Sequence, residues 1–364
     1  MKVVVGISGG VDSAVAALLL KQQGYDVVGL FMKNWDSNIN NDIEGITDGI
    51  CPQELDYRDA KAVCDELSIP LYRVDFIKEY WDDVFSYFLN ELKKGRTPNP
   101  DIMCNKYIKF DKFKEEAKRL GADKIATGHY ARIEGNRLLR GVDNNKDQTY
   151  FLSQVSNEQL KDVLFPIGHL TKEEVRQIAK ENNIPVHNKK DSTGICFIGE
   201  RNYQKFVSNY LKGTPGNIID IETKNVVGKH NGLMNYTIGQ RRNVGLSGDK
   251  QRHYVCGKDN EKNILYIAYG EDSKYLESNE AIIENLNFLY AKHPAFATCK
   301  FRYRSEDIPV QIEYLENNEI LLKYENAKSV TPGQAAVLYI GEQCIGGGII
   351  KEVRNNGEKI WYIN

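Results

Sequence analysis

The sequence predicts an α/β protein that begins with a doubly wound parallel sheet and continues into a small mixed domain and a C-terminal β-barrel. Three observations predict this order. Apolar, β-branched runs alternate with amphipathic helical patterns through about the first 130 residues, which is the rhythm of a parallel sheet covered by helices. Beyond about residue 210 the segments become short and rich in glycine. The last 85 or so residues carry strand-like runs separated by turn signals.

The first domain is expected to follow this alternation element by element. Strands are expected at 2–7, 25–31, 71–76 and 123–127, and helices at 14–23, 54–67, 79–94 and 107–120. A hairpin at 130–133 and 137–140 is expected to end the sheet. Capping-box pairs, Ser156 with Gln159 and Thr171 with Glu174, predict two helices on its flank, the second ending near Asn182.

The remaining elements are shorter. The second domain is expected to contain short strands within 228–246 and 263–269, and the barrel to contain strands at 298–303, 310–314, 319–324 and 335–340. These changes in segment length and composition predict domains at 1–205, 206–275 and 276–364.

Composition excludes several classes of protein. The 364 residues, 41% hydrophobic and 27% charged, are typical of a globular chain of two or three domains. No run approaches about 18 apolar residues, and Met1 leads directly into a strand without the apolar core of a secretory signal, so we expect a cytoplasmic protein with no membrane partner. A net charge of -2 gives no overall basic field, so any nucleic acid must be bound by local basic patches.

The seven cysteines are odd in number and dispersed, and none forms a C-x-x-C pair, so a structural metal site is not expected. In a reducing compartment the default thiol is a small buried hydrophobe. Five cysteines in apolar or alternating contexts are interpreted as structural: Cys51, Cys64, Cys256, Cys299 and Cys344.

The segment from Gly6 to Ser13 is a candidate phosphate-binding loop. It lies between a buried-type strand and an Ala/Leu-rich helix, where open α/β sheets bind ligands. Glycines let backbone N–H groups approach a phosphate, serine hydroxyls add donors, and the helix N-terminus adds positive potential. Asp12 would repel phosphate unless Mg²⁺ lay between them, so we assign it a metal-binding or helix-capping role.

The loop lacks the G-x-x-x-x-G-K-[ST] and G-x-G-x-x-G spacings, and one alternative is an ordinary glycine-rich turn. The full S-G-G-x-D-S pattern resembles the PP-loop of ATP pyrophosphatases, which split ATP to AMP and pyrophosphate. In that interpretation Gly128 forms the opposite wall of the site and Met32 packs on adenine, although Met32 fits a core position nearly as well. The candidate ATP-binding residues are Gly6, Ile7, Ser8, Gly9, Gly10, Val11, Asp12, Ser13, Met32 and Gly128.

Two further cysteines have neighbours that suit chemistry. Cys104 follows a proline-stiffened loop, and Asp101 precedes it by three residues at an expected helix start, where the helix dipole lowers a thiol pKa. Cys196 lies in a polar loop after Lys189 and Lys190, which favour a thiolate and attract phosphate. The alternative for each is a structural thiol: Cys104 buried beside a capping carboxylate, Cys196 packed between its apolar neighbours. Their separation in the chain does not establish that they are in contact.

Taken together, six motifs closely resemble the bacterial tRNA-specific 2-thiouridylase family. The motifs occur in order between Gly6 and Arg304 and are S-G-G-V-D-S, T-P-N-P-D-I-M-C-N-K-Y-I-K-F, G-H-Y-A-R, K-D-Q-T-Y-F-L, D-S-T-G-I-C-F-I-G-E and Y-T-I-G-Q-R-R. The PP-loop alone indicates a superfamily, whereas T-P-N-P-D-x-x-C-N followed by G-I-C-F-I-G-E is specific to this family.

The resemblance implies a reaction. ATP, with Mg²⁺, adenylates the C2 oxygen of the tRNA wobble uridine in the anticodon, and persulfide sulfur displaces AMP to give 2-thiouridine. Cys196 would carry the persulfide, Asp101 would act as acid and base, and Cys104 would release the sulfur or resolve it as a Cys104–Cys196 disulfide. Such a reaction fits the chemistry, because an amide-like oxygen leaves only once it is activated, and persulfide transfer requires a second thiol.

The resemblance also implies binding residues. Asn99, Pro100 and Asp101 would surround the target base, which must be flipped out of its stack. The implied tRNA contacts are Lys146, Asp147, Gln148, Arg302 and Tyr303, which without the resemblance would be ordinary surface groups. An RNA path along local cations is compatible with Lys189, Lys190, Arg241, Arg242, Arg302 and Arg304.

The implied partners are tRNA and a persulfide donor or relay protein, and without C-x-x-C pairs neither an iron–sulfur cluster nor zinc is expected. Two alternatives stay open. One is a PP-loop ligase acting on a small carbonyl acceptor, which leaves both cysteines without a role. The other is a non-catalytic tRNA-binding or sulfur-carrier protein that binds nucleotide as a regulator.

Overall fold

A computed structural model describes the chain except for residues 43–50, 192–201, 247–250, 291 and 364. The chain divides into two compact units. Unit 1 comprises Met1–Ser86, Pro100–Arg201 and Glu342–Ile345, and unit 2 comprises Tyr87–Asn99, Asn202–Gly341 and Gly346–Asn364. The predicted central domain and barrel therefore fall together in unit 2, and the boundaries at 205 and 275 stay predictions.

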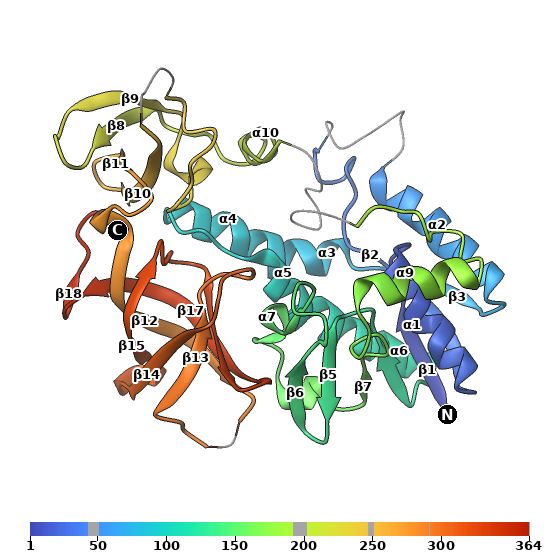
Figure 1. Ribbon diagram of the computed structural model, residues 1–364. Coiled ribbons are helices and arrows are strands. Elements are labelled where there is room, and N and C mark those ends of the chain that lie inside the picture. Colours follow the sequence, from blue (N-terminus) through green and yellow to red (C-terminus); the bar gives the residue numbers. More distant parts are fainter. Residues whose placement is uncertain (43–50, 192–201, 247–250, 291, 364) are drawn as a thin grey trace. The chain divides into compact units, whose positions relative to one another are not determined.

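Unit 1 is built on a parallel sheet with the order β3-β2-β1-β4-β7. Its strands are β1 (Lys2–Gly6), β2 (Asp26–Lys33), β3 (Leu71–Asp75), β4 (Lys124–Ala126) and β7 (Val163–Leu164). The chain builds outward from β1 in one direction through β2 and β3, and in the other through β4 and β7. The order therefore reverses between β1 and β4, where doubly wound sheets bind their ligands. This confirms the predicted fold class (Figure 1).

The prediction that the sheet ends at the hairpin was wrong, because β7 adds a fifth strand beside β4. The hairpin itself is present as β5 (Ala131–Glu134) and β6 (Arg137–Arg140). The start of β17 (Gln343–Asn355) pairs with β6 through Gln343 and Cys344. The sequence does not predict β7, because a strand of two residues is too short to show a hydrophobic period.

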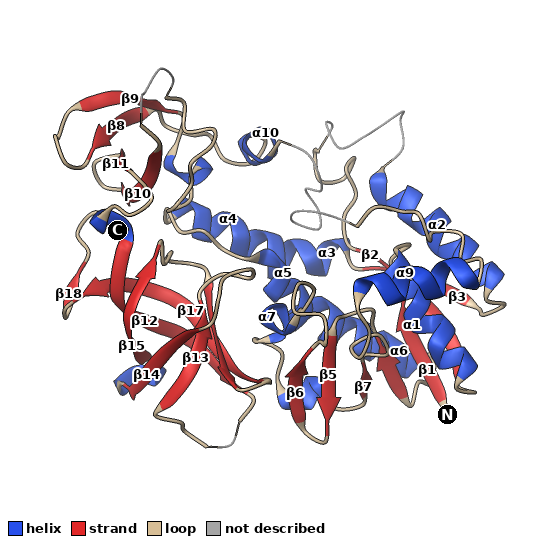
Figure 2. Cartoon of the chain, in the orientation of Figure 1, coloured by secondary structure: helices blue, strands red, loops and turns tan. Residues whose placement is uncertain are grey.

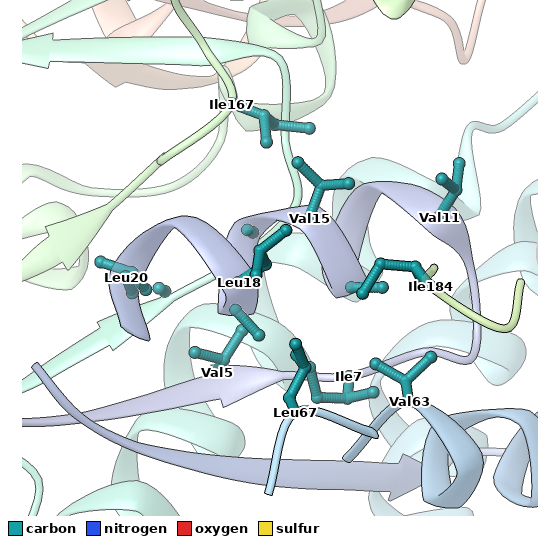
Figure 3. Close-up of a cluster of buried hydrophobic side chains, with 14 of the residues drawn as sticks. Val5, Ile7, Val11, Val15, Leu18, Leu20, Val63, Leu67, Ile167 and Ile184 are labelled. Carbon is teal, nitrogen blue, oxygen red and sulfur yellow. The ribbon is translucent and has the colours of Figure 1, made fainter. Parts of the chain in front are cut away.

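Helix α1 (Val11–Gln22) lies in the core of unit 1 because it is apolar on almost every face. Figure 3 shows Val15 and Leu18 of α1 beside Val5 of β1 and Ile184. Helices α2 (Pro52–Glu66) and α9 (Lys172–Glu181) also contribute, through Val63 and Val175 among others. Both predicted capping boxes are present, at α9 and at α8 (Asn157–Leu160).

Two long helical segments contain a stretch of π-helix each. The first is α3 (Ile77–Tyr80), η2 (Trp81–Phe85, π) and α4 (Ser86–Lys93). The second is α5 (Pro100–Met103), η3 (Cys104–Lys112, π) and α6 (Phe113–Arg119), followed later by the short α7 (Thr149–Leu152). π-Helix is rare and occurs frequently at functional sites. The second segment begins at Pro100, seven residues earlier than periodicity predicts.

Unit 2 contains a four-stranded sheet with the order β10-β11-β8-β9 in its described part. The elements are α10 (Tyr203–Ser208), β8 (Gly216–Asp220), β9 (Val226–His230), η4 (Leu233–Asn235), β10 (His253–Asp259) and β11 (Ile264–Tyr269). Ile218, Val255 and Ile267 are fully buried in its core. Two of these strands, β8 and β10, were not predicted.

The C-terminal strands of unit 2 close into an antiparallel barrel, as predicted (Figure 2). The ring closes because β12 pairs with both β15 and β17. The elements are η5 (Lys274–Leu276), β12 (Glu277–Phe288), β13 (Phe296–Lys300), β14 (Ile308–Tyr314), η6 (Glu316–Asn318), β15 (Ile320–Lys328), β16 (Ala335–Ile340), β17 and β18 (Glu358–Lys359). Within the described ranges, no helix is both long enough and apolar enough to cross a bilayer.

Candidate active site

The segment predicted to bind phosphate connects β1 to α1 at the point where the strand order reverses. Ser13 closes the loop on itself. Its hydroxyl accepts the Ser8 N–H at 3.2 Å, lies 3.2 Å from the Ser8 hydroxyl, and donates to the Gly10 carbonyl at 3.0 Å. Gly10 is the N-cap residue of α1, so the first-turn N–H groups have no intrahelical acceptor, an arrangement that suits the binding of an anion.

Two glycines allow the backbone to approach closely around this loop. Gly9 has a φ of +75°, and an added Cβ would lie 2.3 Å from the Asp56 carbonyl oxygen of α2. At Gly128, after β4, an added Cβ would lie 2.7 Å from the backbone of Asp12 and Ser13. The structure therefore brings Gly128 against the start of α1, whereas its place in the wall of a nucleotide site stays a prediction.

Met32, the candidate adenine contact, lies near Gly6 at the start of the phosphate loop. Its Cε is 3.8 Å from the position of a Cβ on Gly6, and its side chain is half-buried. It occupies the carboxyl end of β2, beside β1 in the sheet. The described residues thus place Gly6 and Met32 together, whereas the proposed packing on adenine stays a prediction.

Asp12 does not cap α1, because Gly10 is the N-cap residue and contributes no side chain. The carboxylate of Asp12 accepts a hydrogen bond from the Tyr130 hydroxyl at 2.8 Å and lies 2.7 Å from the Lys172 ammonium. Burial, together with the charge of Asp12 nearby, raises the pKa of Tyr130, so this hydroxyl stays a donor. The helix-capping prediction was wrong, and the metal-binding role stays a prediction; both contacts end on the Oδ1 atom of Asp12.

Lys172 also forms an ion pair with a second carboxylate, that of Asp191. Three cations surround Asp191: Lys146 at 2.6 Å, Lys172 at 2.7 Å and Arg176 at 2.8 Å. Burial alone would raise the pKa of Asp191, but the hydrogen bonds from Lys146 and Lys172 lower it to about 2. Asp191 is therefore a carboxylate at any physiological pH. Sequence patterns do not indicate this network, because Lys172 resembles an ordinary first residue of a helix.

The segment before Asp191 is also attached to the loop. Lys189 donates to the Gly9 carbonyl at 3.0 Å and pairs with Asp56 at 2.8 Å and Asp59 at 2.6 Å, both on α2. Burial lowers the pKa of Lys189, but these two hydrogen bonds outweigh it and raise the pKa above its ordinary value. Lys189 is thus a cation that is already paired.

Asp101 and Cys104 lie on consecutive elements, α5 and the start of the π-helix η3. Cys104 is only 2% exposed, whereas Asp101 is half-buried. The helix begins at Pro100, so Cys104 follows its first turn, beyond the four N–H groups that carry the positive end of the helix dipole. Next to it, Asn105 donates to the Phe151 carbonyl at 3.0 Å, while its side-chain oxygen is buried without a hydrogen-bond partner among the described residues.

The T-P-N-P-D motif is divided between the two units, since Asn99 belongs to unit 2 and Pro100 to unit 1. Within unit 2, Thr97 is held by Pro332 and Gln334 through hydrogen bonds of 2.9 Å and 2.7 Å. Arg96 pairs with Glu284 at 2.7 Å. The first half of the motif is therefore attached to the barrel.

The predicted tRNA contacts of unit 1 are all hydrogen-bonded within the protein. Lys146 pairs with Asp191. Asp147 is 4% exposed and accepts hydrogen bonds from Gly141 N–H and Thr149. The Gln148 side-chain oxygen accepts from the Tyr130 N–H at 2.9 Å. These residues shape the loop after β6, and their contact with RNA stays a prediction.

In unit 2, Arg302 donates to the carbonyls of Ile238 at 2.5 Å and Ser329 at 2.8 Å. It thereby connects the segment after η4 to the barrel. Tyr303 lies half-buried beside it, under the guanidinium of Arg304. The RNA contacts assigned to Arg302 and Tyr303 also stay predictions.

Cys196 lies outside the described residues. Of the five cysteines interpreted as structural, four are buried, and Cys51 is half-buried. Burial raises the pKa of Cys64 to about 12 and also raises the pKa values of Cys256 and Cys299. In the described part of the chain, no group of three or more His, Cys, Asp or Glu side chains is placed to hold a metal ion.

Comparison with known proteins identifies the family. Three family models match in order: a tRNA methyl transferase HUP domain at residues 1–200, a tRNA methyl transferase PRC-barrel domain at 204–269, and an aminomethyltransferase beta-barrel domain at 278–350. The tRNA-specific 2-thiouridylase MnmA of Mycoplasmopsis synoviae (strain 53) is 55% identical over 99% of this chain and 98% of its own. The chain belongs to the tRNA-specific 2-thiouridylase family.

A relative from outside the mycoplasmas supports this assignment. The tRNA-specific 2-thiouridylase MnmA of Lysinibacillus sphaericus (strain C3-41) is 52% identical over 100% of this chain and 97% of its own. Among solved structures, a 4-thiouridine synthetase–RNA complex with bound ATP covers 57% of this chain and 49% of its own, at 16% identity and a TM-score of 0.33. That similarity is too low to support an inference about this member of the family.

Proposed function

We propose that the protein is an ATP-dependent tRNA-uridine 2-sulfurtransferase that converts the wobble uridine to 2-thiouridine. The observation that carries the proposal is identity of 50–55% to proteins named tRNA-specific 2-thiouridylase along nearly the whole chain. The phosphate loop at the reversal of strand order supports the use of ATP, because its geometry suits an anion.

The first step activates the base. The C2 oxygen of uridine attacks the α-phosphorus of ATP, and pyrophosphate leaves. The N–H groups at the start of α1 and the hydroxyls of Ser8 and Ser13 bind the phosphates. An oxygen ligand such as the Asp12 carboxylate fits Mg²⁺, which proteins commonly bind through one or two carboxylates together with substrate phosphates. Asp12 would hold Mg²⁺ beside these phosphates, where the cation would offset their negative charge.

The second step transfers sulfur. The terminal sulfur of a persulfide on Cys196 attacks C2. The C2–O bond then breaks, and AMP leaves with the former O2. The Cys104 thiolate then attacks the inner sulfur, which gives 2-thiouridine and a Cys104–Cys196 disulfide. In the alternative order, Cys104 first displaces hydrosulfide from the persulfide, and this hydrosulfide attacks C2. Either route consumes one persulfide and leaves a disulfide, which a thiol reductant must reopen.

The remaining roles come from the family motif. Asp101 exchanges protons with the base as O2 is activated and released. Asn99 and Pro100 flank the flipped uridine. Lys146, Asp147, Gln148, Arg302 and Tyr303 contact the tRNA. The persulfide on Cys196 comes from a separate donor or relay protein, and the expected compartment is the cytoplasm.

The test of adenylation is the identity of the nucleotide products. We expect AMP and pyrophosphate from ATP and Mg²⁺ only when unthiolated tRNA is present. ADP as the product, or AMP formed at the same rate without tRNA, would refute adenylation of RNA and favour a ligase with a small acceptor. Nucleotide binding without turnover would favour a regulatory binder.

The test of sulfur transfer uses matched cysteine variants. Cys104→Ala and Cys196→Ala should abolish 2-thiouridine formation, measured by mass spectrometry of digested tRNA. The control, Cys256→Ala, removes a thiol that is fully buried and should retain transfer if the variant folds. Full transfer by Cys196→Ala would refute the persulfide assignment.

A further inference from the structure

A buried lysine in unit 2 has no role in the proposed reaction. Lys258 of β10 is only 3% exposed, and burial lowers its pKa to about 7. None of the carboxylates that the structure describes pairs with it, and its ammonium donates to the Gly95 carbonyl at 3.0 Å. A charge buried with so little compensation costs stability, and departures of this kind are expected at functional sites.

A β-bulge turns the Lys258 side chain inward. One extra residue, Cys256, interrupts the pairing of β10 with β11. Val255, before the extra residue, pairs with Ile267. Lys258, after it, pairs with Leu265, which lies on the same buried face of β11 as Ile267. In a regular strand Val255 and Lys258 would lie on opposite faces, because side chains alternate, so the bulge is what brings the lysine inside.

The carbonyl that Lys258 binds belongs to the end of helix α4. The backbone N–H groups of Gly95 and Arg96 donate to carbonyls of the last helical turn at 3.0 Å, and Gly95 has a φ of +73°. This is a Schellman motif, and the carbonyls that follow it have no helical partner. The central sheet supplies partners: Lys258 binds the Gly95 carbonyl, and the Asn260 amide binds the Lys94 carbonyl at 2.9 Å. A cation at this end of a helix also faces the negative end of the dipole.

The barrel binds the next two residues, Arg96 and Thr97, so residues 94–97 are held from two sides within unit 2. The chain then reaches Asn99, which lies between two prolines. Proline fixes φ, so the chain between Thr97 and Asn99 has little freedom to absorb a displacement. A shift at Gly95 is therefore carried on to Asn99.

We propose that Lys258 is a positioning residue, which together with Asn260 fixes residues 94–97 on the central sheet and so places Asn99 for the target base. The inference rests on the proposed function, since it takes residues 99–101 as the contacts of that base. Packing alone does not call for a lysine here, because a methionine would fill similar space without burying a charge. The lysine adds a donor long enough to reach Gly95 from β10.

The first test is Lys258→Met in the full chain. With enzyme in excess over unthiolated tRNA and with ATP saturating, the rate of tRNA-dependent pyrophosphate release should fall about tenfold or more, because small misplacements of reacting groups cost factors of this size. The dissociation constant of tRNA and the ATP concentration for half-maximal rate should change less than about twofold, because the buried ammonium contacts neither ligand. The control, Lys262→Met, removes the same charge from an exposed position between β10 and β11 and should keep the rate.

Urea unfolding distinguishes positioning from a purely structural role. Lys258→Met loses the bond to Gly95 but also loses the cost of a buried charge, so the stability at pH 7 should change little. A residue that only held unit 2 together would lower stability and rate in parallel. We therefore expect a stable variant that releases pyrophosphate slowly. An undiminished rate would overturn the inference, as would a loss of rate that higher tRNA or ATP concentrations restore.

A pair of glycine variants tests the same contact from the other side. An added Cβ at Gly95 would lie 2.2 Å from the Asn260 side-chain oxygen, so Gly95→Ala must displace the amide that binds Lys94. The matched control is Gly121→Ala after α6, where φ is +79°, the same two backbone hydrogen bonds are present, and the nearest atom is 3.8 Å away.

Both variants carry the same backbone strain, and Gly95→Ala should be slower by about fivefold or more. Equal rates would overturn the inference, and this pair decides the outcome if Lys258→Met does not fold. Where the unmodified protein releases pyrophosphate with tRNA, such a result leaves the proposed function standing. Absence of that release from the unmodified protein would instead refute the proposed function, and the inference with it.

Discussion

Gly9 and Gly10 are adjacent in the phosphate loop, and the structure predicts a large loss of stability when Gly9 is replaced by alanine but little change when Gly10 is replaced. At Gly9 the backbone has a φ of +75°, and an added Cβ would lie 2.3 Å from the Asp56 carbonyl oxygen. Ordinary contact begins at 3.4 Å, so the loop or α2 must move by 3.4 − 2.3 = 1.1 Å. At Gly10, φ is −104° and the nearest atom to an added Cβ is the Ser8 hydroxyl at 3.5 Å.

The expected cost of Gly9→Ala combines two effects. A left-handed conformation costs a residue with a Cβ about 1–2 kcal/mol, and overpacking costs about 1–3 kcal/mol, so the free energy of unfolding should fall by about 2–5 kcal/mol. The movement would also disturb Lys189, which bridges the Gly9 carbonyl and Asp56. For Gly10→Ala, poorer N-capping and reduced entropy of the unfolded chain oppose each other, so the change should stay within about 1 kcal/mol.

Urea unfolding followed by tryptophan fluorescence measures the difference, because Trp35 and Trp81 both belong to unit 1. Measuring the turnover of ATP separates an effect on the site from a loss of stability. Under the proposed function, Gly10→Ala should raise the KM for ATP with little loss of stability, because its methyl group would lie 3.5 Å from the Ser8 hydroxyl, one of the proposed phosphate donors. Equal stability of the two variants would refute the steric argument at Gly9. A greater loss of stability for Gly10→Ala would refute it as well.

Two further predictions concern buried charges. Burial lowers the pKa of Lys258 from 10.5 to about 7. The unfolded chain therefore binds more protons between these values, and the free energy of unfolding should rise by up to about 1.4 kcal/mol per pH unit from pH 7 to pH 10. Lys258→Met should remove this slope in urea titrations; an unchanged slope would contradict the assignment. Asp147→Asn replaces a side-chain oxygen that accepts hydrogen bonds from Gly141 and Thr149, and it should lower the free energy of unfolding by about 1–3 kcal/mol; a stable variant would show that these bonds contribute little.

The parallel sheet could be predicted because its central strand β1 is buried on both faces and apolar, as Val3, Val4 and Val5 show. The longest barrel strand could not. β17 contains three consecutive glycines, which usually mark a turn. In the barrel, added Cβ atoms at Gly346 and Gly347 would lie 1.9 Å and 2.0 Å from carbonyl oxygens of the neighbouring strands. The glycines are there to let those strands approach, and only the assembled barrel shows this.

The site was predictable to the extent that its groups are neighbours in sequence. Ser8 and Ser13 close one loop, and the capping box at Thr171 starts α9. The pairing of Asp12 with Lys172 joins residues 160 positions apart, and no local pattern indicates which carboxylate a lysine will meet. The helix-capping role for Asp12 was wrong for a different reason: α1 begins at Val11, so Gly10 and not Asp12 is its N-cap residue.

The paired cations also explain how a chain with a net charge of -2 can bind RNA selectively. Lys146, Lys172 and Lys189 each already hold a carboxylate, so an RNA phosphate that binds one of them must replace a bond and gains only the difference. Non-specific RNA binding depends on unpaired positive charge, so we expect it to be weak at these three lysines. Under the proposed function, a tRNA would gain most where several such exchanges occur together with insertion of the target base. Internal pairing of the cations would then lower affinity for RNA in general and make binding depend on the complete substrate.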